Sequence, residues 1–347
     1  MSVSVVLLVL LGGALLIPLF GGDDDETDNE NEIDNEILGG PGNDVIDGTE
    51  ENDLIRTFLG DDTIYGNGGN DRIFSGGGDD IVYGGLGNDF VRGGSGNDRI
   101  FGEEGDDRLF GDQGDDYIDG GSGDDIIRGG RGDDLIFGRG GADVMSGEDN
   151  NDTIFGWQNG TVMNGGLTDA DNPDQSNDDT LVMVTGEGVM TNGTGDNMNI
   201  ALANVSDGQE TSIIVTDFDR ADDTLVLTVD YATDGTPMMQ GDADFTINYA
   251  FQDATPDRGA GMLVTVTWDN ADGDVTDQES ASAFLEGFRI GFGGIPGNTP
   301  PSGEIVDNSL INVEVYLTNE ASLDDPVATL QGIGISTPAM ETWFPTT

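Results

Sequence analysis

The chain has 347 residues, a formal net charge of −58 and no Cys, His or Lys, so all eleven positive charges are Arg. Without these residue types the chain excludes disulfides, thiolate nucleophiles, Cys or His zinc sites, triads with a His base, Walker phosphate loops and Schiff-base enzymes. The negative charge argues against nucleic acid or anionic lipid as a partner, because both are polyanions.

An apolar run of 18 residues, Val3–Phe20, lies at the start of the chain. As a helix it would be about 27 Å long, enough to cross a bilayer core. No basic residue precedes it and no small-x-small cleavage site follows, as a secretory signal would require. We therefore expect residues 1–22 to form a hydrophobic helix that is a membrane anchor or uncleaved signal, with a removed signal as the alternative.

Residues 21–38 contain nine acidic residues and no basic one. Such a segment repels itself and cannot bury a core. We expect residues 23–38 to be an acidic linker.

A repeat of nine residues governs residues 39–156. An aspartate recurs every nine residues, and an apolar residue follows two positions after each one. The aspartates are Asp44, Asp53, Asp62, Asp71, Asp80, Asp89, Asp98, Asp107, Asp116, Asp125, Asp134, Asp143 and Asp152, and the apolar residues run from Ile46 and Ile55 to Met145 and Ile154. A fixed period of nine predicts a parallel β-helix of the calcium-binding kind.

The residue types explain why this repeat would bind calcium. The last three residues of a unit, such as Arg99–Phe101, favour a short strand with its central side chain inward. The glycine-rich remainder favours a tight turn, because glycine adopts positive φ angles and leaves backbone carbonyls accessible. Carbonyl and carboxylate oxygens are the ligands that Ca²⁺ prefers, about six to eight of them.

Electrostatics favours a bound cation as well. Stacked turns would place equivalent aspartates about 4.8 Å apart, where two carboxylates repel by roughly 3 kcal/mol at an effective dielectric of about 20. Residues 39–155 contain 28 acidic residues and 8 Arg, a net charge of 8 − 28 = −20. If units two apart share an ion, the thirteen loops have about eleven gaps, and eleven Ca²⁺ would nearly cancel this charge.

The repeat resembles the RTX (repeats-in-toxin) family, whose pattern is Gly-Gly-x-Gly-x-Asp-x-hydrophobic-x. Five units, beginning at Gly39, Gly84, Gly93, Gly120 and Gly129, have the full Gly-Gly-x-Gly-x-Asp form. The resemblance implies a right-handed parallel β-roll with two units per turn and calcium held between loops. The implied metal-binding residues are the thirteen aspartates with Gly40, Gly42, Gly85, Gly87, Gly94, Gly96, Gly121, Gly123, Gly130 and Gly132.

Three units depart from this pattern. The units from Gly48 and Gly147 lack the second and third glycines, and the unit from Thr57 lacks both leading glycines. These units lie near the two ends of the array, where we expect weaker sites, as in capping repeats. The alternative for the whole region is a disordered Gly/Asp-rich linker, which we expect to describe the calcium-free state.

The C-terminal region, 157–347, is predicted to be a β-rich module after a loop at 157–179. Short apolar runs broken by turn residues predict its strands, without a convincing helix: Thr180–Thr185, Met198–Ala203, Ser212–Phe218, Thr224–Tyr231, Phe245–Phe251, Met262–Trp268, Phe288–Phe292 and Leu310–Leu317. Alternatively, 157–205 continue the roll in degenerate form, because Asp179-Thr180-Leu181 and Asp196-Asn197-Met198 keep the aspartate-x-apolar step. Residues Ile213–Leu225 resemble the segment after the repeats in RTX proteins, which implies a β-rich cap bearing on folding or export.

No enzyme is expected. Asp269–Asp274 could chelate calcium but lacks EF-hand spacing, and a hairpin at Asp272-Gly273 is the favoured interpretation. Asp269 beside Trp268 is the best candidate for a catalytic carboxylate with a raised pKa.

We predict a non-enzymatic, secreted or cell-surface calcium-binding protein whose roll folds on binding Ca²⁺ and presents the C-terminal module, in a structural or adhesion role. A carbohydrate-binding or carboxylate-based carbohydrate-active protein, with the roll as a folding aid, is the alternative. The expected partners are calcium, a membrane through residues 3–20 and an unknown protein or glycan, but not nucleic acid.

Overall fold

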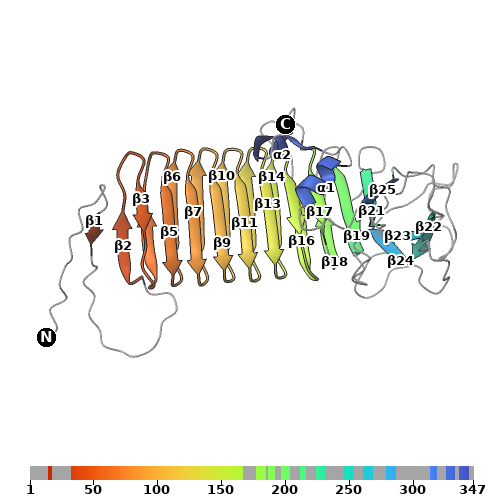
Figure 1. The fold of residues 1–347 in the computed structure, drawn as a ribbon, viewed down its shortest axis with the longest axis horizontal. Helices are drawn as coiled ribbons and strands as arrows, with labels where there is room; N and C mark the ends of the chain where they lie inside the picture. The colour runs from red at the N-terminus through yellow and green to blue at the C-terminus, as the bar shows by residue number, and fades with distance from the viewer. Residues whose placement is uncertain are drawn as a thin grey trace, which may run out of the picture. The chain divides into compact units, whose positions relative to one another are not determined.

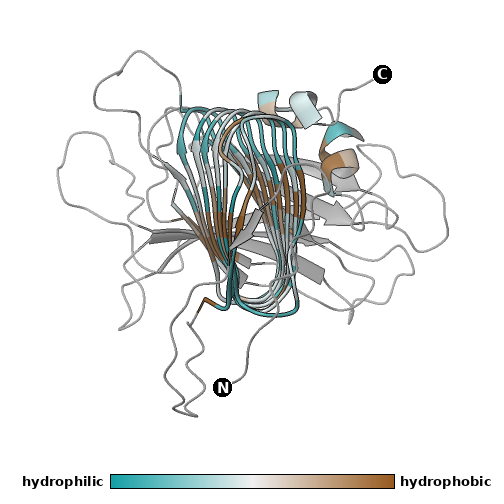
Figure 2. Ribbon diagram, turned by 90° about the vertical axis from the view of Figure 1, so that its left-hand side faces the viewer, coloured by the Kyte–Doolittle hydropathy of each residue, from teal (hydrophilic) through white to brown (hydrophobic). Residues whose placement is uncertain are grey.

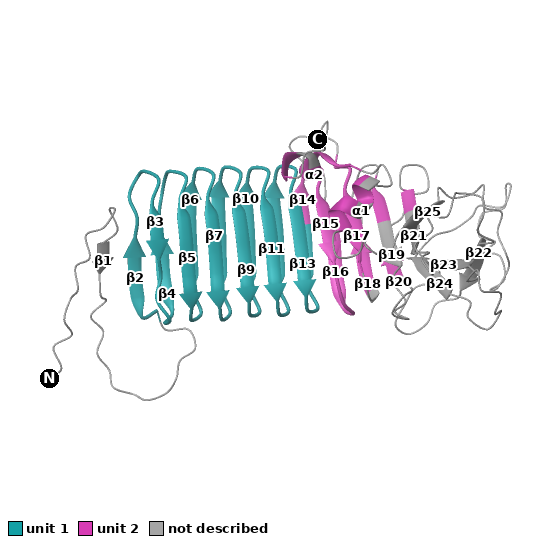
Figure 3. Ribbon diagram, viewed as in Figure 1, with its two compact units in different colours: residues 1–146 teal, residues 147–347 magenta. Residues whose placement is uncertain are grey.

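A computed structural model describes residues 15–17 and 33–166 together with separate segments of the remaining chain. These segments are 177–184, 187–191, 197–203, 212–215, 224–230, 245–252, 261–268, 279–286, 313–318, 326–332 and 336–343. The chain divides into two compact units, residues 1–146 and 147–347 (Figure 3).

The first unit is a parallel β-roll of short strands (Figure 1). One sheet has the order β1-β2-β4-β6-β8-β10-β12 and the other β13-β11-β9-β7-β5-β3. The strands are β2 (Asn35–Leu38), β3 (Val45–Asp47), β4 (Asp53–Arg56), β5 (Thr63–Gly68), β6 (Arg72–Gly77), β7 (Ile81–Leu86), β8 (Phe90–Ser95), β9 (Arg99–Glu104), β10 (Arg108–Gln113), β11 (Tyr117–Ser122), β12 (Ile126–Arg131) and β13 (Leu135–Gly140), while β14 (Val144–Asp149) contains the division between the units.

One turn of the roll takes two nine-residue units. Each strand pairs in parallel with the strand two further along the chain, and the partners are 18 residues apart, as Ile100 and Ile118 are in β9 and β11. This confirms the parallel roll that the repeat predicts.

The core is a row of inward apolar side chains, one from each strand, and β13 also buries Leu135. Ile64, Ile73, Val82 and Val91 have no exposed surface, and every other residue predicted at this position is at most 2% exposed. Figure 2 shows hydrophobic residues along the strands and hydrophilic ones at the turns. Burying one aliphatic side chain contributes roughly 1.5–3 kcal/mol, so this row is the main hydrophobic contribution to the stability of the roll.

The strands are longer than the sequence predicts. Most contain six residues, as in Arg99–Glu104, instead of three. Their pairing continues into the glycine cluster, where Glu103 of β9 lies opposite Gly85 of β7. The turn proper is therefore shorter than the predicted six residues.

The roll also begins earlier than predicted. Asn35–Leu38, placed at the end of the acidic linker by sequence, forms β2 and pairs in parallel with β4. Ile37 is 4% exposed and takes the inward position. The expected linker is thus corrected at its last four residues.

Of the segment expected to be a hydrophobic helix, the structure describes only Leu15–Ile17. These residues form the strand β1, antiparallel to β2, so the helix expectation is wrong for them. The rest of Val3–Phe20 lies outside the described residues, and no described helix is long and apolar enough to cross a membrane.

Aromatic side chains stack on the outward face of the sheet that contains β5, β7, β9, β11 and β13. Ring centroids are 5.1 Å apart for Tyr65 and Tyr83 and 5.0 Å apart for Tyr83 and Phe101, and the stack continues through Tyr117 and Phe137. Stacked aromatic neighbours on adjacent strands stabilise a sheet beyond their burial.

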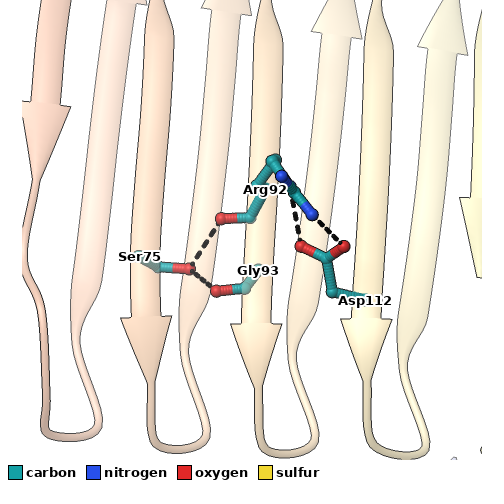
Figure 4. Close-up of polar contacts among 4 residues, drawn as sticks. All are labelled: Ser75, Arg92, Gly93 and Asp112. Carbon is teal, nitrogen blue, oxygen red and sulfur yellow. Dashed lines mark hydrogen bonds and ion pairs between the residues drawn. The ribbon is translucent and has the colours of Figure 1, made fainter. Parts of the chain in front are cut away.

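The outward face of the other sheet carries arginine and phenylalanine. Arg56 and Arg72 lie over the rings of Phe74 and Phe90, and Arg92 forms a bidentate ion pair with Asp112 (Figure 4).

The second unit continues with parallel pairing before it changes to antiparallel. Parallel neighbours follow the orders β15-β17-β19-β21-β25 and β16-β18-β20-β24, and β24, β23 and β22 are antiparallel. The elements are β15 (Thr153–Gly156), β16 (Thr161–Gly166), β17 (Thr180–Met183), β18 (Glu187–Thr191), β19 (Met198–Ala203), β20 (Ser212–Val215), β21 (Thr224–Asp230), β22 (Phe245–Gln252), β23 (Gly261–Trp268), β24 (Glu279–Glu286), β25 (Val313–Thr318), α1 (Pro326–Gly332) and α2 (Pro338–Trp343).

The parallel pairs through β19 have the arrangement expected if 157–205 continue the roll. The predicted loop 157–179 contains the strand β16, and β24 and the two short helices were not predicted from sequence. The predicted strand Phe288–Phe292, the hairpin at Asp272-Gly273 and residues 216–223 of the RTX-like segment lie outside the described residues.

Candidate metal centre

The predicted aspartates of the first unit form two ladders, one at each edge of the roll. From Asp44 to Asp125, the backbone N–H of each ladder aspartate donates to Oδ1 of the aspartate one turn further on. Examples are Asp71 to Asp89, Asp89 to Asp107 and Asp98 to Asp116, each at 2.8 Å. The nine-residue spacing thus brings these aspartates together in two continuous rows.

The carboxylates of these ladders are buried. From Asp53 to Asp152 each predicted aspartate is at most 2% exposed, and only Asp44 is partly exposed. Among the described atoms, Oδ2 has no hydrogen-bond partner in the ladder members Asp62, Asp71, Asp89, Asp98, Asp107, Asp116, Asp125 and Asp143. A buried carboxylate oxygen without a partner is costly, so these atoms require a positive charge or a proton.

The first two units of the roll satisfy their aspartate carboxylates with hydrogen bonds from the protein. Oδ2 of Asp44 accepts a hydrogen bond from the Gly40 N–H, and Oδ2 of Asp53 accepts one from the Thr49 N–H at 2.6 Å. Oδ1 of Asp53 also accepts from the Asn35 amide. The protein itself supplies donors here, so the need for a cation is smaller than in the middle of the roll.

In most units, space beside the unpartnered oxygen is kept by a glycine at the first position of the unit. A Cβ atom on Gly93 would lie 2.3 Å from Asp98 Oδ2 and 3.0 Å from the carbonyl oxygen of Gly111 in the next turn. Gly84 has the same relation to Asp89 and Gly102. Gly93 and Gly84 have no positive φ angle, so glycine is needed at this position for space. We call this space the cradle; it is bounded by the first residue of a unit, the ladder aspartate and the next turn's carbonyl.

The cradle fits a hard cation. Its oxygens are a carboxylate and backbone carbonyls, the donors that Ca²⁺ takes. Among the described residues no three acidic side chains gather at one point, so a cation in the roll would take most of its ligands from the backbone.

Glycines at the second and fourth positions of a unit shape the turn. Gly94 and Gly96 have φ angles of 115° and 122°, and a Cβ on either would lie 2.1 Å from a carbonyl of the preceding turn. Of the predicted glycines, Gly85, Gly87, Gly94, Gly96, Gly121, Gly123, Gly130 and Gly132 have positive φ, whereas Gly40 and Gly42 do not.

These two glycine positions differ in what they tolerate. Second positions without glycine, apart from Thr49, adopt the left-handed region, as at Asn67 (φ 75°) and Asp112 (φ 77°). The fourth position is glycine in every unit from Gly60 to Gly141, with φ between 111° and 142°. Because side chains rarely adopt such angles, the fourth position is the stricter requirement.

Sequence reasoning missed a second, outer ladder. The residue before each ladder aspartate accepts a hydrogen bond at Oδ1 from the backbone one turn further on, as Asp79 does from Asn97 at 2.8 Å and Asn97 from Asp115 at 2.9 Å. Its signal was visible, because this position is Asn or Asp in every unit except at Ala142. Together the ladders bond each turn to both of its neighbours.

The inner ladder continues inside the second unit. Asp152 N–H donates to Asp179 Oδ1 at 2.9 Å, and Asp179 N–H donates to Asn197 Oδ1 at 2.8 Å. The spacing from Asp152 to Asp179 is 27 residues, nine more than a regular turn. Asn197, rather than the predicted Asp196, occupies the next ladder position. The buried Asn199 takes the inward place that Leu181 has one turn earlier.

Burial raises the pKa of the ladder carboxyls in the absence of a cation. The pKa of Asp89, Asp98 and Asp125 is raised to about 8 and that of Asp71 to about 7, chiefly by burial. The folded calcium-free roll therefore binds protons that the unfolded chain, with ordinary Asp pKa values, releases.

Acid should consequently favour the calcium-free roll. The stabilisation by protons is complete below the ordinary Asp pKa and is lost as the pH rises through about 8. For protein dialysed free of calcium, we expect far-UV circular dichroism to show more β structure near about pH 5.5 than near about pH 9. Less β structure at the acidic pH would contradict this assignment of the buried carboxyls.

The comparisons agree with this geometry. The model of the RTX calcium-binding nonapeptide repeat matches residues 32–57, 56–91, 83–118, 92–127 and 119–154. The first match begins ahead of β2, in agreement with the early start of the roll. A comparison of the chain with curated proteins gives no match.

Proposed function

The chain carries RTX calcium-binding nonapeptide repeats that form a parallel β-roll, and we propose that this roll is a calcium-triggered scaffold that presents the C-terminal region in a structural or adhesive role. The observation that carries the proposal is the row of buried, unpartnered Oδ2 atoms, most of them beside a cradle kept open by glycine. A cation in each cradle would satisfy the carboxylate and join two turns. Binding and folding would then be one event.

The residues that would hold calcium are the ladder aspartates and the first-position carbonyls, such as Asp98 with Gly111. Eleven ions remain the count for a roll in which every gap is filled. The predicted glycines at the second and fourth positions would contribute by fixing the turn.

We expect Asp98→Ala to remove more bound calcium than Asp53→Ala. Asp98 Oδ2 has no protein partner, whereas the Asp53 carboxylate already accepts hydrogen bonds from Thr49 and Asn35. Isothermal titration with Ca²⁺ of the chelator-treated full-length variants measures the difference. Equal losses of ions in the two variants would count against cation binding at the cradle.

Location outside the cytoplasm is supported by the repeats, which are typical of secreted proteins. Attachment to a membrane through residues 3–20 is part of the proposal and rests on the apolar run alone. Deleting residues 1–22 should move the protein from the membrane fraction to the soluble fraction, and an unchanged distribution would contradict an anchor.

The proposal includes no catalytic activity, because His, Cys and Lys are lacking. The carbohydrate alternative depends on Asp269 and the side chain of Trp268, which lie outside the described residues. It stays a prediction, and a glycan screen of the calcium-loaded protein, repeated with Asp269→Asn, would test it.

A further inference from the structure

The two edges of the roll differ in the residues that line their cradles. At the edge where the odd-numbered strands β3 to β13 begin, the first position of the unit before each strand is, in chain order, Gly39, Thr57, Ser75, Gly93, Gly111 and Gly129. At the opposite edge it is glycine throughout, from Gly48 to Gly138. Thr57 and Ser75 are thus the two departures, and they lie in consecutive turns of one edge.

Both side chains are fully buried and donate a hydrogen bond to the next turn. The Thr57 hydroxyl lies 2.6 Å from the Ser75 carbonyl oxygen. The Ser75 hydroxyl lies 2.8 Å from the Gly93 carbonyl oxygen and 3.2 Å from that of Arg92 (Figure 4). The acceptors at Ser75 and Gly93 are first-position carbonyls, the same group that bounds a regular cradle.

Comparison with Gly93 shows what these side chains occupy. A Cβ on Gly93 would lie 2.3 Å from Asp98 Oδ2, and Thr57 and Ser75 place a real Cβ and a hydroxyl at this position of their own units. The aspartate ladder nevertheless passes through these turns unchanged, since Asp62 N–H donates to Asp80 Oδ1 and Asp80 N–H to Asp98 Oδ1, both at 2.8 Å. The turns keep their form while the cradle is filled.

We propose that Thr57 and Ser75 close the cradles beside Asp62 and Asp80 to calcium, with a hydroxyl proton bonding the carbonyl that a cation would otherwise take. This inference rests on the proposed calcium function. It reduces the expected ions from eleven to nine and makes the array asymmetric: one edge runs without a break, and the other has two closed cradles between Gly39 and Gly93. The two hydroxyls would join the early turns of this edge without an ion.

The test is a count of Ca²⁺ ions bound by the chelator-treated full-length protein, measured by isothermal titration. Thr57→Gly/Ser75→Gly should bind two more ions than the parent, because both cradles are opened. Thr57→Ala/Ser75→Ala should bind the parental number, since the Cβ atoms remain. Ser95→Gly, at an exposed position, is the matched control and should change nothing.

The reverse substitution gives an independent measurement in case Thr57→Gly/Ser75→Gly fails to fold. Gly93→Ser places a hydroxyl residue beside Asp98 and should remove one ion, with the calcium-loaded circular dichroism spectrum unchanged. An unchanged count in the double glycine variant, with an unchanged count in Gly93→Ser, would overturn the inference. A loss of ions in the double glycine variant would overturn it too, by showing that the hydroxyls are ligands. A parent protein that binds no Ca²⁺ would refute the proposed function itself, which is a distinguishable result.

Discussion

Removing calcium should unfold the roll formed by residues 33–146. In chelator near neutral pH, far-UV circular dichroism should lose most of the β signal of this region, and millimolar Ca²⁺ should restore it. The effect should be large because the repeat region 39–155 carries a net charge of −20. Ladder carboxyls that stay ionised repel by roughly 3 kcal/mol per contact at an effective dielectric of about 20. Those whose pKa is raised by burial must instead take up protons that the unfolded chain releases at neutral pH, which also costs free energy.

The hydrophobic core is too thin to offset this repulsion. Each strand buries one apolar side chain in the row from Ile37 to Met145, and only β13 adds two more, Leu135 and Phe137. The entropy of ordering nine residues opposes each such gain at about 1–2 kcal/mol per residue. Mg²⁺ at the same concentration is the control, since it prefers rigid octahedral sites and keeps its waters. A β signal that is identical before and after chelation would contradict calcium-dependent folding.

Gly96→Ala should destabilise the calcium-loaded protein by about 3 kcal/mol or more. The φ angle of Gly96 is 122°, and a Cβ there would lie 2.1 Å from the Gly78 carbonyl oxygen, a backbone atom that cannot move alone. Strain and steric overlap therefore add. Urea unfolding at saturating Ca²⁺ measures the free energy of unfolding.

Gly42→Ala is the control for this substitution. Gly42 is also a fourth-position glycine, but it has no positive φ and a Cβ there would meet nothing within 4 Å. Its effect should stay within about 0.5 kcal/mol. Similar losses for Gly96→Ala and Gly42→Ala would show that the fourth position has no special backbone requirement.

The nine-residue period of the sequence is also the period of the structure, so the positions of residues within the roll could be predicted. One register places Asp98 at the turn and Ile100 in the core, and both are where the repeat predicts them. The parallel roll and its 18-residue turn follow as well.

What could not be predicted depends on atoms that face each other across turns. The length of the strands and the hydroxyl bonds of Thr57 and Ser75 depend on contacts between residues 18 apart. Residue types alone do not specify such contacts. In the second unit the regular 18-residue spacing from Asp179 leads to Asn197, but the ladder position was assigned to Asp196 because an aspartate was expected there.

Anomalous X-ray diffraction from crystals of the calcium-loaded protein tests the central claim most directly, because it locates the ions themselves. We expect anomalous peaks within coordination distance, about 2.3–2.6 Å, of Asp98 Oδ2 and the Gly111 carbonyl oxygen, and in the equivalent glycine-lined cradles along both edges. Calcium-loaded crystals with no peak beside any buried ladder aspartate would contradict the account.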